Sequence, residues 1–156
     1  MEIKFKLNGK EIKAEVEADT ILLDLLREQG CYSVKRGCET ANCGLCTVLM
    51  NKKSVLSCSI LAVQADGQEI VTLEGMQKEA EEFGDFLANE GAEQCGFCNP
   101  GFIMNVFAML EEIEEPTEEE ILEYLAGNLC RCSGFVGQTR SILKFLEYKK
   151  GGKKEA

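Results

Sequence analysis

The chain has 156 residues, enough for one ordinary domain or two small ones, and its apolar content of 45 % excludes a disordered chain. Its formal net charge of −10 argues against a nucleic-acid binder, because such proteins present a basic face. No apolar run approaches the roughly 18 residues of a membrane-spanning helix, and no basic segment followed by an apolar one begins the chain, so we expect a cytoplasmic protein without a membrane partner.

The first half of the chain has the pattern of strands around one helix. Asn8-Gly9 favours a hairpin turn between two strands. A leucine-rich helix follows, which we expect Asp19 or Thr20 to cap and Gly30 to end. Four segments have the alternation or the β-branched composition of strands: residues 3–7, 12–16, 47–50 and 69–73. This order of elements predicts an α+β fold of ferredoxin type.

The second half of the chain has the pattern of helices. Asn99 can cap one of them, with Pro100 at its first position, where proline is favoured. Thr117 and Glu120 form a capping box at the start of another. Four helices are expected, at about residues 78–90, 99–110, 117–127 and 139–148. Four short helices indicate a small bundle.

The counts of cysteine and histidine narrow the chemistry. The chain has nine cysteines and no histidine. Without histidine there can be no Rieske centre, no Cys₂His₂ zinc finger, no c-type haem attachment and no Ser-His or Cys-His nucleophile pair. Cytosolic thiols stay reduced, so metal binding is favoured over disulfides. The cysteines fall into two groups, and we expect domains at residues 1–76 and 77–150 with a flexible tail at 151–156.

The first group of cysteines has the spacing of a plant-type [2Fe–2S] site. Cys38, Cys43 and Cys46 form C-x₄-C-x₂-C, and Cys58 lies downstream. Two bridged irons need four thiolates from different directions, and one tight loop can supply three of them. A Cys₄ zinc site is the alternative, although zinc sites usually pair their cysteines as two C-x₂₋₄-C units. The remaining Cys31 is expected to be a buried structural thiol.

The second group is less specific on its own residues. Cys95-x₂-Cys98 and Cys130-x-Cys132 offer four thiolates from two loops at helix ends. The helix that follows Cys98 would direct the partial positive charge of its N-terminus toward an anionic group. Three interpretations stay open here: an iron–sulfur cluster, a zinc ion, or a redox-active pair formed by Cys95 and Cys98.

Three motifs in order resemble a known family. Residues 37–48, 94–102 and 128–135 are similar to the cluster-binding motifs of the iron–sulfur subunit of molybdenum hydroxylases, the xanthine dehydrogenase, aldehyde oxidase and aerobic carbon monoxide dehydrogenase relatives. The resemblance runs from about residue 3 to residue 148. It implies an N-terminal β-grasp [2Fe–2S] ferredoxin domain followed by a C-terminal four-helix bundle with a second [2Fe–2S] cluster.

The resemblance also implies ligands, partners and a path for electrons. Electrons would pass from a molybdopterin site in a large partner subunit, through the second cluster and then the first, to an FAD-binding subunit. Gln94 and Cys132 would lie against the pterin of the partner. The implied ligands are Cys38, Cys43, Cys46 and Cys58 for the first cluster, and Cys95, Cys98, Cys130 and Cys132 for the second. Residues 35–40 are similar to bacterial xanthine or purine dehydrogenase relatives, which suggests a purine such as xanthine as substrate of the complex.

The chain carries no visible catalytic apparatus of its own. It has no G-x-G-x-x-G turn after a strand and no Walker loop, so we expect a component of an oxidoreductase and not a catalyst by itself. Phe97, Phe102 and Phe135 are candidates for a partner interface or for the core. Two other functions stay open: a freestanding two-cluster ferredoxin that serves another reductase, and a zinc-stabilised interaction module.

Overall fold

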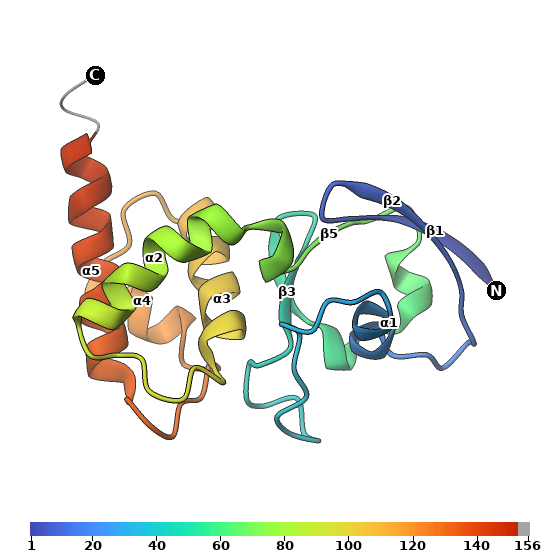
Figure 1. The fold of residues 1–156 in the computed structure, drawn as a ribbon, viewed down its shortest axis with the longest axis horizontal. Helices are drawn as coiled ribbons and strands as arrows, with labels where there is room; N and C mark the ends of the chain where they lie inside the picture. Colours follow the sequence, from blue (N-terminus) through green and yellow to red (C-terminus); the bar gives the residue numbers. More distant parts are fainter. Residues whose placement is uncertain (153–156) are drawn as a thin grey trace.

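A mixed sheet forms the first half of the chain in a computed structural model that describes residues 1–152 (Figure 1). Its strands are β1 (Glu2–Leu7), β2 (Lys10–Glu15), β3 (Thr47–Met50), β4 (Lys53–Leu56) and β5 (Glu69–Val71). They lie in the order β2-β1-β5-β3-β4. The β1–β5 pair is parallel and the other pairs are antiparallel.

The sheet buries one face against a short helix, α1 (Leu22–Glu28). Alternate residues of β1, namely Ile3, Phe5 and Leu7, point into this core, as the period of two in a strand requires. All four leucines of α1 are buried there too. A mixed sheet that holds a helix against one face is the β-grasp arrangement, so the predicted α+β class is confirmed.

The sequence predicted the first hairpin turn correctly but the N-terminal cap of α1 wrongly. Asn8 and Gly9 have φ angles of 50° and 81°, the left-handed values that a tight hairpin turn needs. The expected cap of α1 by Asp19 or Thr20 is wrong, because Ile21 precedes the helix and makes no side-chain cap. The hydroxyl of Thr20 instead accepts a hydrogen bond from the N–H of Glu17, 3.0 Å away, and closes a turn before the helix.

Helices form the second half of the chain, beside the sheet (Figure 1). Aromatic rings fill their common core, with the rings of Phe83 and Phe145 5.2 Å apart. Thr117 and Glu120 make the expected capping box, whereas Asn99 is the first helical residue and not a cap. The helices are α2 (Gln77–Asn89), α3 (Asn99–Glu112), α4 (Glu118–Tyr124) and α5 (Phe135–Gly152).

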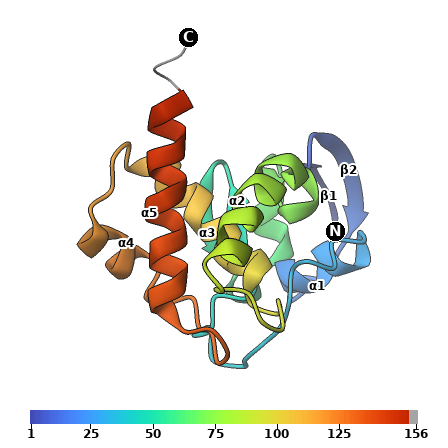
Figure 2. The same cartoon turned by 60° about the vertical axis from the view of Figure 1, so that its left-hand side comes forward.

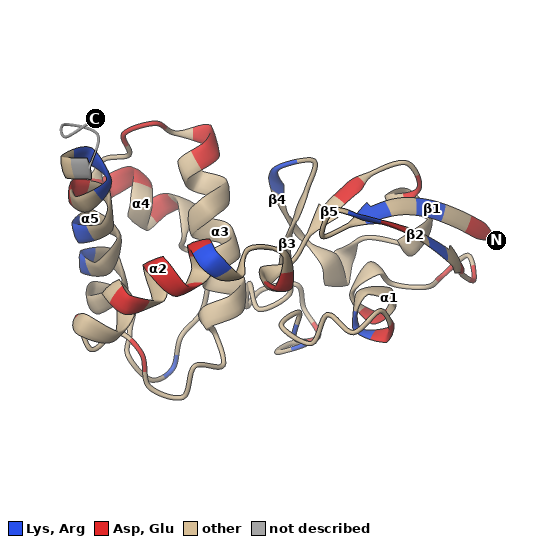
Figure 3. Cartoon of the chain, turned by 45° about the horizontal axis from the view of Figure 1, so that its top comes forward, with Lys and Arg blue, Asp and Glu red and all other residues tan. Residues whose placement is uncertain are grey.

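The last helix crosses the helical half and continues into part of the expected tail. Figure 2 shows α5 running the full height of this half, and Figure 3 shows its basic residues near acidic residues of α2. Arg140 and Lys144 both pair with Glu90, and Lys149 pairs with Glu82. The helix includes Gly151, while residues 153–156 of the expected tail lie outside the described residues.

The two halves meet where α3 packs against β3. Leu49 of β3 forms a small buried cluster with Met104 and Ala108 of α3. This contact brings the start of α3, which follows Cys98, close to the loop that precedes β3 and contains Cys43. None of the helices in the described part of the chain is long and apolar enough to span a membrane.

Candidate metal centres

Seven of the eight candidate ligands lie on three loops at the same edge of the molecule, and the eighth, Cys58, lies in the short 3₁₀ helix Ser57–Ser59 after β4. In Figure 1 the loop before β3, the loop between α2 and α3, and the loop between α4 and α5 all lie along the lower edge. Each loop joins regular elements whose positions are fixed by the two cores. The fold therefore gathers thiols that are far apart in the sequence.

The first loop directs backbone N–H groups at its sulfurs. The N–H of Asn42 donates to Sγ of Cys38 over 3.3 Å. This hydrogen bond, with another from the N–H of Thr40, lowers the pKa of Cys38 to about 6. Ala41 and Gly44 have positive φ angles of 52° and 73°, which bend the loop back on itself. At Cys38 the loop thus favours the thiolate, the form of cysteine that binds metal.

The thiols of the first group lie in two pairs. A hydrogen bond from the side chain of Cys43 helps to lower the pKa of Cys38, while burial raises the pKa of Cys43 itself. Burial raises the pKa of Cys46 to about 11, with a further contribution from the thiol of Cys58. Cys43 and Cys46 are buried, whereas Cys38 and Cys58 are partly exposed.

The thiols of the second group also lie in two pairs. The Sγ atoms of Cys95 and Cys132 are 3.6 Å apart. Burial raises the pKa of Cys98 to about 11, and the neighbouring thiol of Cys130 adds to that rise. Burial opposes the ionisation of Cys130, but backbone N–H groups at residues 132–134 outweigh it and lower its pKa. This loop therefore also favours one thiolate through N–H groups of its backbone.

Two pairs of thiols suit a two-iron cluster. Four thiolates shared by two irons give each iron two protein ligands, beside the sulfides that bridge the metals. A zinc ion would need all four around a single point. Within residues 1–152, no three His, Cys, Asp or Glu side chains converge in that way. The number of sulfurs, their pairing and the surrounding N–H groups all fit a [2Fe–2S] cluster in each loop system.

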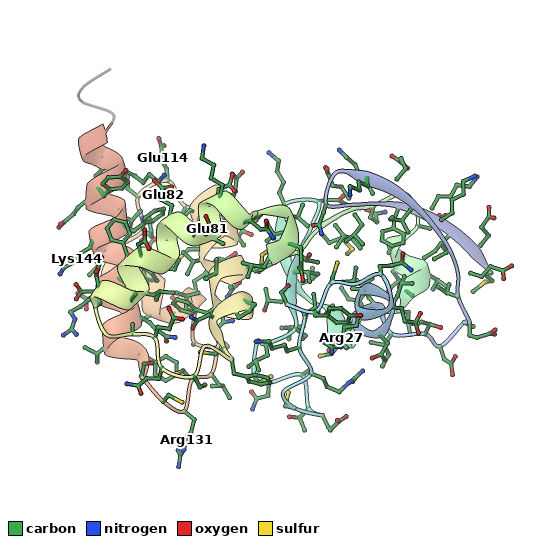
Figure 4. The ribbon with its side chains drawn as sticks, viewed as in Figure 1. Arg27, Glu81, Glu82, Glu114, Arg131 and Lys144 are labelled. Carbon is green, nitrogen blue, oxygen red and sulfur yellow. The ribbon has the colours of Figure 1, made fainter. Side chains whose placement is uncertain are left out.

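The second site lies open at the surface of the chain. Cys95 and Cys132 are exposed, as is Gln94 beside them. Arg131, between the last two cysteines, points away from the molecule at the loop tip (Figure 4). Exposed apolar side chains rim the site: Phe97, Leu129, Phe135 and Val136. Phe102, the third phenylalanine that the sequence offered for an interface, is only 2 % exposed and belongs to the core.

The two sites are joined by direct hydrogen bonds. The N–H of Leu129, next to Cys130, donates to the carbonyl oxygen of Cys43 over 3.0 Å. The side-chain amide of the buried Asn128 donates to the carbonyls of Gly44 and Gly101, each 3.3 Å away. One hydrogen bond thus separates a backbone carbonyl of the first group from the residue beside a thiol of the second.

Close backbone contact at this junction requires glycine. A Cβ on Gly101 would lie 2.2 Å from the carbonyl oxygen of Gly44, which is shorter than any real contact. A Cβ on Gly44 would lie 2.6 Å from the side-chain nitrogen of Asn128. The sequence reasoning assigned no role to Gly101 or Asn128. Both lie inside motifs that the sequence displayed, but their partners are distant along the chain.

Cys31 belongs to neither group of cysteines in the sequence. It is 4 % exposed and packs in the core of the sheet domain. The side-chain amide of Asn8 lies 3.8 Å from its sulfur, and burial raises its pKa. Its position agrees with the structural thiol that the sequence predicted.

Comparison with known proteins identifies the cofactors. A family described as "2Fe-2S iron-sulfur cluster binding domain" matches residues 5–83, and one described as "[2Fe-2S] binding domain" matches residues 72–143. The chain is 43 % identical to the "Nicotinate dehydrogenase small FeS subunit" of Eubacterium barkeri, over 86 % of this chain and 87 % of that protein. It is 46 % identical to the "Xanthine dehydrogenase iron-sulfur-binding subunit" of Escherichia coli O157:H7, over 90 % of this chain and 91 % of that protein.

The chain belongs to the family of iron–sulfur subunits of molybdenum hydroxylases. The crystal structure of quinoline 2-oxidoreductase from Pseudomonas putida 86 contains a chain of the same fold, with a TM-score of 0.88 and 35 % identity, covering 100 % of this chain and 98 % of that one. The cofactors of the present chain are two [2Fe–2S] clusters, and its role is electron transfer. The zinc and redox-dithiol interpretations of the second group are therefore wrong, and so is the zinc-stabilised interaction module.

Proposed function

We propose that this subunit takes electrons from a molybdopterin site in a large partner chain and passes them to an FAD-binding chain. A [2Fe–2S] cluster, when bound, accepts and releases one electron at a time. Cys38, Cys43, Cys46 and Cys58 hold the first cluster, and Cys95, Cys98, Cys130 and Cys132 hold the second. The observation that carries this assignment is the match of residues 5–83 and 72–143 to two [2Fe–2S]-binding families, since each range contains one group of four thiols.

Electrons enter at the second site. The exposed thiols of Cys95 and Cys132, with their apolar rim, are the part of the chain that a partner must cover to exclude water. Gln94 is exposed beside Cys95, so its side-chain amide is free to contact the pterin of the large subunit, as is Cys132. Burial of the rim in the complex holds the two redox sites close together.

Electrons cross to the first site through the junction between the loops. The hydrogen bond from Leu129 N–H to the carbonyl of Cys43 is the shortest polar link between the two cysteine groups that the described residues offer. Electrons leave the first site toward the FAD-binding chain, on the side where Cys38 and Cys58 are partly exposed. The two domains that divide this work meet near residue 76, between the end of β5 and the start of α2.

The partner chain chooses the substrate. Seven of the similar proteins carry names that refer to nitrogen heterocycles, namely xanthine, nicotinate, nicotine and quinoline, and four carry names that refer to aldehydes. A nitrogen heterocycle such as a purine is thus the substrate class that we propose for the complex. We place the complex in the cytoplasm with no membrane attachment.

Purification under anaerobic conditions tests this function. The chain should contain about four irons and about four acid-labile sulfides, and two distinct [2Fe–2S] signals should appear in the electron paramagnetic resonance (EPR) spectrum after reduction. A large chain that contains molybdopterin should copurify with it. An isolated monomer that is fully active with an unrelated reductase would instead favour the freestanding ferredoxin. A colourless, iron-free protein would contradict both.

A further inference from the structure

Gln138 is a buried polar side chain beside the second site. It lies in the first turns of α5 and is 2 % exposed. It lines a cavity of about 300 Å³ together with apolar side chains that include Phe102, Ile121 and Leu125. Among the side chains that the structure describes, its Oε1 is the one buried oxygen or nitrogen atom without a hydrogen-bond partner. An apolar residue would avoid this loss, so the glutamine needs another explanation.

The other end of the same amide faces the metal site. Nε2 of Gln138 lies 4.0 Å from Sγ of Cys98, at the long end of the range for a donor that faces sulfur. This orientation of the amide is the favourable one, because a metal-bound thiolate accepts hydrogen bonds and cannot donate them. The reverse orientation would point a carbonyl oxygen at the negative sulfur. The unpaired oxygen is therefore the consequence of a nitrogen that points at Cys98.

Cys98 also has fewer backbone donors than its partner thiol. Backbone N–H groups of residues 132, 133 and 134 surround the sulfur of Cys130. The sulfur of Cys98, which is partly buried, receives a backbone hydrogen bond from its own residue. A side-chain donor at this position supplies what the backbone does not.

We propose that Gln138 is a positioning residue that donates an N–H···S hydrogen bond to Cys98 and thereby raises the reduction potential of the second cluster. The proposal rests on the assignment of Cys98 as a ligand. Reduction adds one electron and breaks no bond, so the sulfur becomes more negative and the donor stabilises the reduced form more than the oxidised form. The apolar neighbours of the Gln138 side chain, which is 2 % exposed, strengthen this hydrogen bond. A higher potential at the entry site favours the arrival of electrons from the partner.

Redox titration of Gln138→Met protein tests this inference, since methionine matches the length of glutamine without its amide. The full chain, loaded with both clusters, is titrated while the two EPR signals are followed separately. We expect the ratio of reduced to oxidised second cluster at a fixed potential to fall about tenfold, equivalent to about 59 mV for one electron. The first cluster should not shift and serves as an internal control.

Thr139→Val is the matched control. Thr139 lines the same cavity, and its hydroxyl donates to the carbonyl of Phe135 over 3.0 Å and not to a thiol. This variant should leave both potentials unchanged. Equal shifts in Gln138→Met and Thr139→Val would overturn the inference, because they would reflect packing alone. Two intact clusters with unshifted potentials in Gln138→Met would also overturn it, whereas unsubstituted protein without iron would refute the proposed function itself.

A measurement without substitution at Gln138 covers the case in which the variant fails to load. Protein with ¹⁵N in its glutamine side chains, in a Gln94→Leu background that removes the glutamine beside Cys95, should show ¹⁵N hyperfine coupling to the reduced second cluster in pulsed EPR. Observation of that coupling supports the donor assigned to Gln138. Its absence, with the second signal present, would overturn the inference.

Discussion

The two metal sites differ in how much of their shelter this chain provides. In the first loop system Cys43 and Cys46 are only 8 % and 4 % exposed, because the loop folds back against the sheet domain and α3. In the second, Cys95 and Cys132 are exposed in the loops that precede α3 and α5, and exposed apolar side chains lie near them. The first site thus takes more of its shelter from this chain, and we expect a partner to cover the second. Two sites with four cysteines each therefore differ in how much solvent reaches their thiols.

The largest expected effect is the selective loss of one cluster when one of its ligands is removed. Cys43→Ser should abolish the EPR signal of the first cluster and keep the second, and Cys95→Ser should do the reverse. Each variant should retain about two irons in place of about four, since each cluster contains two. Metal analysis together with EPR checks both numbers.

Cys31→Ser is the control for these variants. Cys31 is buried in the sheet core, where its sulfur faces the side chain of Asn8, and it is not one of the proposed ligands, so both signals should persist. Loss of both signals in Cys43→Ser would show that the sites fold as one unit. Retention of both would show that Cys43 is not a ligand.

The rate at which a chelator removes each cluster measures how well the protein shields the two sites from solvent. In the isolated chain the second cluster should be lost at least about tenfold faster than the first, because solvent reaches Cys95 and Cys132 directly. Visible absorption and EPR during incubation with EDTA measure the two rates. In the complex with the large subunit the difference should disappear, since the partner covers the rim. Equal rates in the isolated chain would show that exposure of the thiols does not control cluster loss.

The sequence predicted those features that depend on neighbours along the chain. Asn8-Gly9 fixed the first hairpin because its turn needs left-handed backbone angles, and Thr117 fixed the start of α4 through a local capping box. The cysteine spacings predicted the two groups of thiols for the same reason. Strand β4 (Lys53–Leu56) was missed, because this short segment is held as a strand by pairing with β3 and not by its own pattern.

Features that depend on the meeting of the two halves could not be predicted. Asn128 donates to Gly44, a residue 84 positions earlier, and nothing in the local sequence of either residue indicates the other. Gln138 carries no signal in a periodic helix except that it is polar at a buried position. The ferredoxin-type class was predictable from local pattern, while the coupling of the two sites is a property of the tertiary structure.

Asn128→Leu tests that coupling and should have a moderate effect. The substitution leaves the carbonyls of Gly44 and Gly101 and the amide of Asn105 without their buried partner, which should lower the free energy of unfolding by about 2–3 kcal/mol. Chemical denaturation measures the loss. Because the junction loosens, the magnetic interaction between the two reduced clusters should also weaken in EPR. Asn105→Ala, which removes one donor to Asn128, should have a smaller effect on both measurements.

The smallest expected effect belongs to a contact at the edge of the junction. Lys35 leaves the first loop, donates to the carbonyl of Phe97 over 3.1 Å and lies 4.7 Å from the centre of the Phe97 ring, between Cys95 and Cys98. Because this contact is exposed, Lys35→Met should lower the free energy of unfolding by only about 0.5–1 kcal/mol. Chemical denaturation checks the value against Lys13→Met on the distant strand β2, which should change it less.

The charge of Lys35 gives this contact a second consequence that separates it from packing. Its ammonium group lies beside the exposed second site, so its loss should make reduction of that cluster slightly less favourable, and more so at low salt than at high salt. Redox titrations of Lys35→Met at two ionic strengths measure this dependence. A shift in the potential of the second cluster that does not depend on salt would mean that the substitution has moved the loop. Lys35 would then hold the junction between the two sites in the way proposed for Asn128.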